Sequence, residues 1–183
     1  MNTETFAKTK VGKVALKILG AVMESRFRYR FFGPARILAA ADIQPGRSVL
    51  EIGCGTGYFT VPAAGMVGER GSLTAIDILS ESVEFVTKRV RAAGLTNVRV
   101  IKADALDTGF NDGSFDTVLL FGVIPAPMLP LHRLLAELHR VLKPDGTLAV
   151  WPPVPGLLPK SILQSHLFTL AGKRNSVYTF KRT

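Results

Sequence analysis

The chain has 183 residues, enough for one domain with a full hydrophobic core, and its formal net charge is +9. The single cysteine, Cys54, excludes an internal disulfide and a cysteine-based metal centre, and we expect no metal. The sequence has neither a signal-peptide pattern nor an apolar run long enough to cross a membrane. These features favour a cytoplasmic protein and leave contact with a membrane surface open.

The positive charge gathers at the two ends of the chain. Residues 1–33 sum to +5, residues 160–183 sum to +5, and the residues between them sum to −1. In the first segment apolar side chains recur with a helical period and lysines take the other side, which predicts a basic amphipathic helix. Its apolar positions are Val11, Val14, Ala15, Ile18 and Val22. Arginine and aromatic residues then alternate from residue 26 to residue 31.

Three interpretations of this N-terminal segment stay open. The helix can cover a binding site as a lid, or its basic, apolar pattern can bind a membrane surface. Alternatively, the three arginines can contact phosphates while the aromatic residues between them stack on bases. The first two interpretations are compatible with each other. We therefore predict two units, residues 1–34 as a basic helix or lid and residues 35–183 as the main domain.

The most informative segment begins with an apolar run that ends at the acid Glu51. Glycines follow at every second position, namely Gly53, Gly55 and Gly57. Glycine tolerates positive φ and lets a ligand approach the backbone, so the segment predicts a strand, a nucleotide-binding turn and a helix start. The spacing differs from the G-x-G-x-x-G of dinucleotide-binding turns, which disfavours an NAD-dependent enzyme. Cys54, inside the turn, is interpreted as a small buried residue and not as a nucleophile.

Further apolar runs follow at the spacing of strands that alternate with helices. They cover residues 71–76, 98–102, 115–122 and 146–151. Asp77 follows the first of them, and Asp104 follows the second. Acids at strand ends gather at the carboxyl edge of an open sheet, where ligands bind in such folds. Helices are predicted over residues 35–41, 80–93 (with Ser80 as the cap), 129–142 and 159–166, and a closing hairpin over residues 166–171 and 177–181.

In this order the motifs resemble those of the class I S-adenosylmethionine-dependent methyltransferases, over roughly residues 35–183. The motifs are Glu51-x-Gly53-x-Gly55-x-Gly57, Asp77, Asp104-Ala105, Phe115-Asp116 and the run from Leu142 to Gly146. The chain looks most like the small-molecule subgroup that includes the ubiquinone and menaquinone methyltransferases. The resemblance implies a Rossmann-like α/β fold, with a doubly wound, mostly parallel seven-stranded sheet, an antiparallel last strand and helices on both faces. It also implies S-adenosylmethionine as the cofactor.

The resemblance further implies roles for individual residues at the adenosine end of that cofactor. Asp77 would hold the ribose hydroxyls, and Ile78 would pack against adenine. Asp104 would accept a hydrogen bond from the adenine amine, and the Ala105 backbone would read the ring edge.

At the methionine end, Gly53 and Gly55 would border the cofactor, and Glu51 would help to place its amino group. Phe121 and Gly122, at the end of the fourth strand, would lie beside the same part. The predicted cofactor-binding set also contains Cys54 and Gly57.

The sequence identifies no catalytic residue. Methyl transfer is an in-line displacement, so alignment and exclusion of water can supply most of the rate. His132, near the start of a predicted helix, lies toward the active edge, but a structural or solvated role is the favoured interpretation. His139 is interpreted as an outward or packing residue.

The acceptor is indicated only by two proline-rich apolar loops, residues 122–130 and 151–159. They suit a small or lipid-like acceptor, although packing against the N-terminal helix explains them equally well. No Asp- or Asn-Pro-Pro-aromatic motif follows the fourth strand, which argues against methylation of DNA bases or glutamine side chains. Two alternatives stay open. One is an RNA methyltransferase that uses the basic ends, and the other is an S-adenosylmethionine-binding protein without transferase activity.

Overall fold

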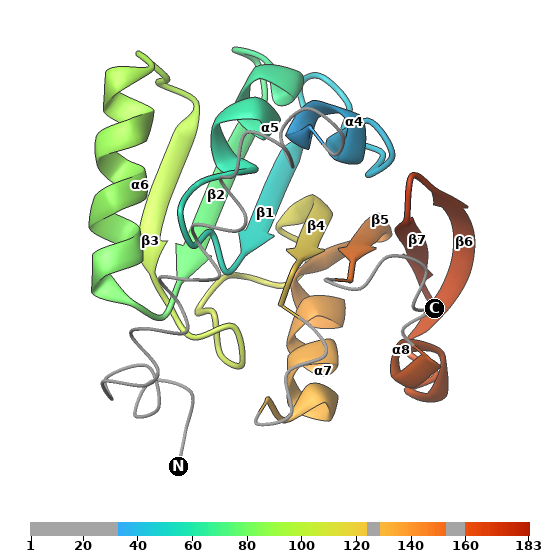
Figure 1. Ribbon diagram of the computed structural model, residues 1–183. Coiled ribbons are helices and arrows are strands. Elements are labelled where there is room, and N and C mark those ends of the chain that lie inside the picture. The colour runs from blue at the N-terminus through green and yellow to red at the C-terminus, as the bar shows by residue number, and fades with distance from the viewer. Residues whose placement is uncertain (1–32, 124–128, 153–159) are drawn as a thin grey trace.

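The computed structural model describes residues 33–123, 129–152 and 160–183. Its centre is a seven-stranded sheet in the order β3-β2-β1-β4-β5-β7-β6 (Figure 1). In chain order the strands are β1 (Ser48–Ile52), β2 (Ser72–Asp77), β3 (Val98–Lys102), β4 (Phe115–Phe121), β5 (Leu142–Trp151), β6 (Phe168–Arg174) and β7 (Val177–Arg182). The strands predicted from apolar runs are therefore present.

Neighbouring strands from β3 to β5 pair in parallel, whereas β7 runs antiparallel to both β5 and β6. The strand order reverses between β1 and β4, which are neighbours in the sheet although β2 and β3 separate them in the chain. Ligands of open α/β sheets bind outside the carboxyl ends of the strands at such a reversal. The predicted Rossmann-like sheet with an antiparallel last strand is confirmed.

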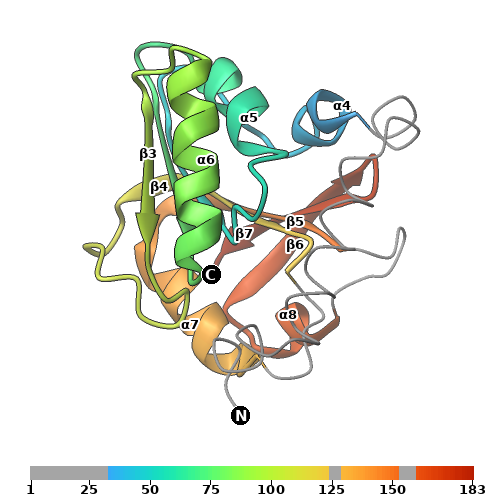
Figure 2. The same cartoon turned by 60° about the vertical axis from the view of Figure 1, so that its left-hand side comes forward.

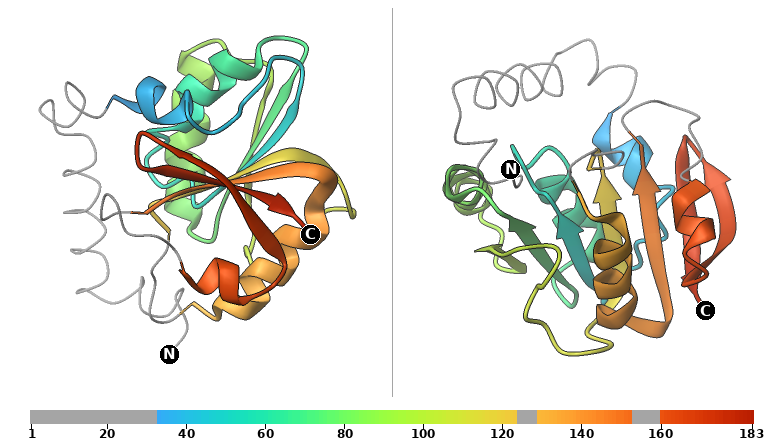
Figure 3. Two further views of the ribbon diagram at one scale, coloured as in Figure 1. Left: turned by 90° about the vertical axis from the view of Figure 1, so that its right-hand side faces the viewer. Right: turned by 90° about the horizontal axis from the view of Figure 1, so that it is seen from below.

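Helices cover both faces of the sheet (Figure 3, left). They are α4 (Pro34–Leu38), α5 (Thr60–Val67), α6 (Ser80–Ala92), α7 (Leu131–Val141) and α8 (Lys160–Gln164). The buried side chains of α4, α5 and α6 pack on one face, and those of α7 and α8 pack on the other. In Figure 2 helix α6 stands nearest the viewer, beside β3.

The alternation of side chains along β1 explains the two-sided core. Leu50 and Ile52 belong to the apolar cluster under α7, whereas Val49 belongs to the cluster under α4 and α5. Successive side chains of a strand point to opposite faces, so a strand buried on both faces is apolar almost throughout. Glu51 interrupts this run on the α5 face although it is only 3% exposed. A buried acid in such a strand needs a polar partner or a ligand.

Several boundaries differ from the prediction, and α4, α7 and α8 are shorter than the helices predicted over residues 35–41, 129–142 and 159–166. Ser80 is the first residue of α6 and not its cap, because Asp77 accepts a hydrogen bond from the Leu79 backbone, which leaves Leu79 at the cap position. Strand β5 begins at Leu142 and not at residue 146, since the chain becomes extended directly after α7. The final hairpin turns through only Asn175 and Ser176, both with positive φ, and its strands are longer than predicted.

Candidate functional site

The carboxyl ends of β1, β2, β3 and β4 lie at one edge of the sheet, at the bottom in Figure 1. The predicted site residues lie at these strand ends: the glycine turn after β1, the acid that ends β2, the acid after β3 and the glycine after β4. Within the described part of the chain, no group of three or more His, Cys, Asp or Glu side chains is placed to hold a metal ion. Nor is any helix in those ranges long and apolar enough to span a bilayer.

The glycine turn has the backbone conformation that its spacing predicts. Gly53, Gly55 and Gly57 have φ angles of +71°, +51° and +75°. The Gly57 amide donates a hydrogen bond of 2.7 Å to the Cys54 carbonyl, which closes the turn before α5. Residues that carry a side chain rarely adopt positive φ, so glycine at these positions keeps the backbone of the turn free of strain. The turn therefore presents bare backbone at the edge of the sheet.

Cys54 contributes its backbone and not its thiol to this edge. The Cys54 and Gly53 amides donate hydrogen bonds of 3.0 and 2.9 Å to the Ile76 carbonyl at the end of β2. The Cys54 side chain is buried with Ala75 and Val86 in the cluster beneath α6. Burial raises the pKa of the thiol well above its usual range, and the nearby acids raise it further. The thiol therefore stays protonated, as a buried structural cysteine does.

Asp77 joins the glycine turn to the loop after β2. Its two carboxylate oxygens accept hydrogen bonds of 2.9 Å from the Gly55 amide and 3.0 Å from the Leu79 amide. Asp77 is 9% exposed. Burial raises its pKa, although hydrogen bonds from the backbone of Leu79, Gly55 and Ile78 oppose that rise. Each oxygen retains a lone pair after these bonds, so the carboxylate can still accept from a ligand hydroxyl.

Glu51 lies in β1, two residues before the first glycine of the turn, and is buried. Its carboxylate accepts a hydrogen bond of 2.6 Å from the Thr60 hydroxyl at the start of α5. Burial raises the pKa of Glu51 to about 7, the Thr60 bond opposes this, and the charge of Asp77 adds to it. No ion pair joins Glu51 or Asp77 to a cation in the described ranges. Two buried acids therefore stand together without an ion-pair partner among the described residues.

Glu51→Gln is expected to change how stability depends on pH. The folded protein binds more protons than the unfolded chain between pH 4.5 and about pH 7 at this site, so stability falls as pH rises through that window. Glutamine mimics the protonated acid, so the variant should equal the wild type near pH 4, below the pKa of the unfolded chain. At pH 8 it should be the more stable protein, by about 3 kcal/mol. Urea unfolding of both proteins from pH 4 to pH 8 measures this, and parallel pH profiles would contradict it.

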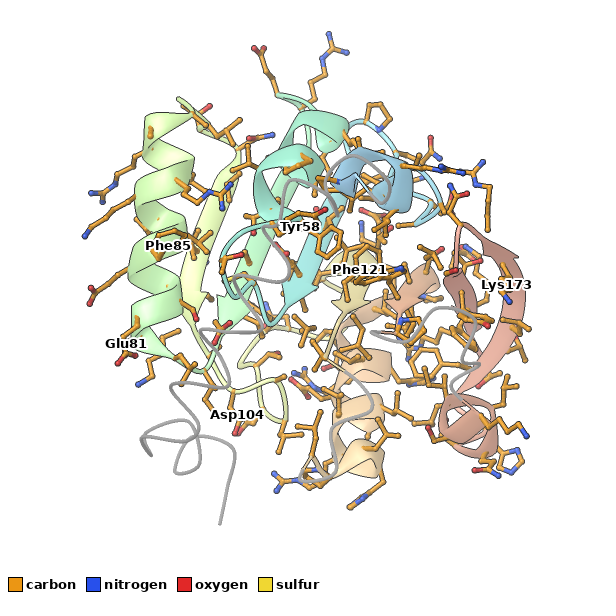
Figure 4. All side chains as sticks on the ribbon, viewed as in Figure 1. Tyr58, Glu81, Phe85, Asp104, Phe121 and Lys173 are labelled. Atoms are coloured by element: carbon orange, nitrogen blue, oxygen red, sulfur yellow. The ribbon has the colours of Figure 1, made fainter. Side chains whose placement is uncertain are left out.

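The acid after β3 lies in a tight turn. Asp104 Oδ1 accepts a hydrogen bond of 2.9 Å from the Leu106 amide, and the Asp107 amide donates to the Asp104 carbonyl at 3.1 Å. The Ala103 amide donates to the Asp77 carbonyl at 3.1 Å, so this turn is tied to the acid that ends β2. Figure 4 shows the exposed Asp104 side chain at the edge of the sheet. Ala105 is the next residue along the chain. Asp104 thus lies close to Asp77 in the fold, as predicted.

Phe121 and Gly122 end β4 at the same edge. The Phe121 ring, labelled in Figure 4, is buried and packs edge-to-face against Phe59, with 5.0 Å between ring centroids. Phe59 also packs against Tyr58 and Trp151. This aromatic cluster beneath the site was not predicted, although the Tyr-Phe pair directly after the third glycine is a signal for it. The Phe121 side chain therefore supports the turn from within the core.

Gly122 directly follows β4, and its backbone can be approached closely by a ligand. Its φ is +72°, and a Cβ added to it would meet no atom of the described residues within 4 Å. The two histidines considered as bases lie elsewhere: His132 is exposed in the first turn of α7, and His139 Nε2 lies 3.2 Å from the Thr183 carbonyl. The predicted lid and most of both apolar loops fall on residues 1–32, 124–128 and 153–159, outside the described residues.

The donor and acceptor set fits S-adenosylmethionine. This cofactor carries two ribose hydroxyls, an ammonium group and a sulfonium cation, and the site offers two buried carboxylates without a cationic partner in the described ranges. Burying a carboxylate without a partner is unfavourable, and a cationic ligand relieves that cost. Three positive-φ glycines supply the close approach that the ligand needs.

Comparison with known proteins agrees with this chemistry. Residues 49–146 match the family described as methyltransferase domain, which is more than half of the chain. Nocamycin O-methyltransferase of Saccharothrix syringae is 37% identical over 128 residues, covering 68% of this chain and 45% of that protein. Demethylmenaquinone methyltransferase of Geobacillus stearothermophilus is 33% identical over 111 residues, covering 60% of this chain and 47% of that protein. The chain thus spans about half the length of these curated relatives.

A solved structure is similar over nearly its whole length. It is a SAM-dependent methyltransferase from Aquifex aeolicus, 26% identical, with a TM-score of 0.73 and coverage of 91% of this chain and 94% of that chain. The family match over residues 49–146 and the cofactor named for that structure agree with the fold and the cofactor that the motifs implied. The chain therefore belongs to the methyltransferase domain family, within the class I S-adenosylmethionine-dependent methyltransferases.

Proposed function

We propose that this protein holds S-adenosylmethionine at the carboxyl edge of its sheet and transfers the methyl group to a small or lipid-like acceptor. The observation that carries the proposal is the pair of buried acids, Glu51 and Asp77, beside three positive-φ glycines. In the described ranges neither acid has an ion-pair partner, and the cofactor brings the cationic groups that would compensate them.

We assign the residues as follows. Asp77, fixed by the Gly55 and Leu79 amides, accepts from the ribose hydroxyls, and the neighbouring Ile78 packs against adenine. Asp104 and the Ala105 backbone recognise the adenine edge. At the methionine end the bare backbone of the glycine turn and of Gly122 borders the ligand, and Glu51 lies beneath it. Cys54, Gly57 and Phe121 keep these elements in place from the interior.

Methyl transfer requires little acid–base catalysis from the protein. When bound, S-adenosylmethionine supplies an electrophilic methyl group on a sulfonium sulfur. The chain's residues fix the orientation of the site and keep it dry, and alignment can account for most of the rate of an in-line displacement. A specific base is therefore not required, and neither of the two histidines on α7 is assigned this role.

The names of the relatives support a small acceptor. They are called after nocamycin and demethylmenaquinone, two small molecules and not macromolecules. The two predicted apolar loops after β4 and β5 suit such a partner. We propose that residues 1–34 form a lid over this side of the site and contact a membrane surface when the acceptor is lipid-like. The protein would then act in the cytoplasm.

The described C-terminal cations favour this proposal over RNA. Lys181 donates hydrogen bonds to the Asp145 carbonyl and to the Thr147 hydroxyl, and Arg182 donates to the Leu142 carbonyl. The Lys173 ammonium lies 5.0 Å from the centroid of the Tyr178 ring. Cations that hold the protein's own backbone and rings are less available to phosphates.

The test is methyl transfer from labelled S-adenosylmethionine into extract of the source organism, followed by separation into organic and aqueous phases. We expect label in the organic phase with the wild type and none with Asp77→Ala. Label found only in aqueous small molecules would keep the transferase and remove the lipid-like acceptor. Label in RNA would show that the acceptor is RNA and not a small or lipid-like molecule. Tight cofactor binding without label in any fraction would overturn the transferase and favour a binding protein.

A further inference from the structure

The loop between β3 and β4 is held in place by α7. It runs from Ala103 to Ser114, is largely exposed, and contains the turn in which Asp104 pairs with Asp107. Thr108 follows that turn directly and is buried. The loop therefore begins at the adenine side of the site and is anchored one residue after its first turn.

The anchor is a pair of residues one helical turn apart on α7, which we call the Glu137–Arg140 clamp. Glu137 Oε1 accepts hydrogen bonds from the Thr108 amide at 2.8 Å and from the Thr108 hydroxyl at 2.6 Å. Arg140 Nη2 and Nε donate to the two Glu137 oxygens at 2.7 and 2.9 Å. Arg140 Nη1 donates to the Phe110 carbonyl at 2.7 Å and to the Asp112 carboxylate at 2.6 Å.

The hydrogen bonds of the clamp fix the position of the loop between β3 and β4. Four of its bonds go to loop residues: two join the loop backbone, at the Thr108 amide and the Phe110 carbonyl, and two join the side chains of Thr108 and Asp112. Glu137 is 8% exposed, and the Arg140 partner lowers its pKa to about 2, so it remains a carboxylate at neutral pH. The Arg140 side chain is 34% exposed, and an ion pair of this kind adds little net stability, so the contribution of the pair lies in the geometry that it specifies.

We infer that the Glu137–Arg140 clamp positions the Asp104 turn for recognition of the adenine amine, and that it is a specificity-determining element although it lies outside the cofactor site. This inference rests on the proposed function. The path is short. Glu137 accepts hydrogen bonds from Thr108, Asp107 directly precedes Thr108 in the chain, and the Asp107 amide donates to the Asp104 carbonyl. Loss of the clamp lets the turn shift while Asp77 and the glycine turn keep their own bonds.

The test compares two ligands on the full chain. S-adenosylhomocysteine carries the adenine amine, whereas S-inosylhomocysteine carries a carbonyl oxygen at that position, which a carboxylate repels. Titration calorimetry should show that the wild type prefers the adenine ligand by about tenfold or more, the usual effect of one lost charge-assisted hydrogen bond. In Glu137→Gln we expect the Kd for S-adenosylhomocysteine to rise about tenfold and the preference to fall to about twofold.

Two further variants separate positioning from stability. Thr108→Val removes the hydroxyl bond, keeps the ion pair, and should reduce the preference to an intermediate value. Asp116→Asn disrupts a similar cluster at the amino edge of the sheet, where Asp116 accepts from Arg47, Lys143 and the Ser48 amide, each at 2.9 Å. It should lower the melting temperature and leave the ligand preference unchanged.

The outcomes are distinct. A wild-type preference retained in Glu137→Gln would overturn the inference and leave the clamp as a structural ion pair. Equal loss of preference in Asp116→Asn would also overturn it, because the effect would follow stability and not loop position. If the wild type bound neither ligand, the proposed function itself would fall.

Discussion

Asp77→Ala is expected to raise the Kd for S-adenosylhomocysteine by at least about 100-fold. The side chain accepts hydrogen bonds from the Gly55 amide and the Leu79 amide, and it is the group assigned to the ribose hydroxyls. Hydrogen bonds to a charged group each contribute about 1.5–3 kcal/mol, and two of them correspond to roughly two orders of magnitude in affinity. Titration calorimetry at neutral pH measures the change directly.

The same substitution should have a smaller effect on stability than on binding. Burial raises the pKa of Asp77, so the folded protein already carries a desolvation penalty that alanine removes. Glu81→Ala is the matched control: it removes an acid from the first turn of α6, exposed at the same edge (Figure 4). We expect a change in Kd of less than about threefold, the size of an exposed charge effect. An Asp77→Ala protein with wild-type affinity would contradict the assignment of the site.

Local sequence signals were sufficient for the sheet and for the backbone of the site. Strand β3 covers the predicted residues 98–102, and β2 ends at Asp77 as the acid after an apolar run indicates. Such signals work because a strand buried on both faces must be apolar and because positive φ favours glycine. The order of the strands followed from resemblance and not from any local pattern.

Side-chain partners far apart in sequence could not be predicted. Glu137 and Thr108 are 29 residues apart, and Arg47 and Asp116 are 69 residues apart. Each looks like an ordinary surface polar residue in the sequence, and only the packing of α7 or of β1 against its neighbours brings the partners together. The orientation of Cys54 is similar: its place in the turn was evident, but the turn's twist decides that the thiol enters the core beneath α6.

The predicted boundaries failed where a tertiary contact fixed the chain. Ser80 has the residue type of a helix cap, yet the bond from the Leu79 amide to Asp77 starts the helix one residue earlier than a Ser80 cap would. Strand β5 was predicted from its apolar part, whereas pairing of Leu142 with Phe115 extends it through polar residues. In both cases a long-range partner outweighs local preference.

Gly57→Ala should lower the free energy of unfolding by about 2–5 kcal/mol. Two effects add at this position. The residue has a φ of +75°, where a side chain costs about 1–2 kcal/mol. A Cβ there would also lie 3.2 and 3.3 Å from the two methyl groups of Val86, inside the core under α6. Overpacking of this kind typically costs about 1–3 kcal/mol. Urea unfolding of wild type and variant measures the sum.

Gly94→Ala separates the two effects. Gly94 follows α6 with a φ of +65°, but an added Cβ would meet no atom within 4 Å, so only the backbone term of about 1–2 kcal/mol applies. The steric term can be isolated by combining Gly57→Ala with Val86→Ala, where the double variant should recover about 1 kcal/mol relative to the sum of the single changes. Strict additivity of the two changes in unfolding free energy would show that the Val86 side chain moves aside without destabilising the protein. Gly57 would then be required for its backbone conformation alone, and the glycine turn would have room for a side chain on its α6 side.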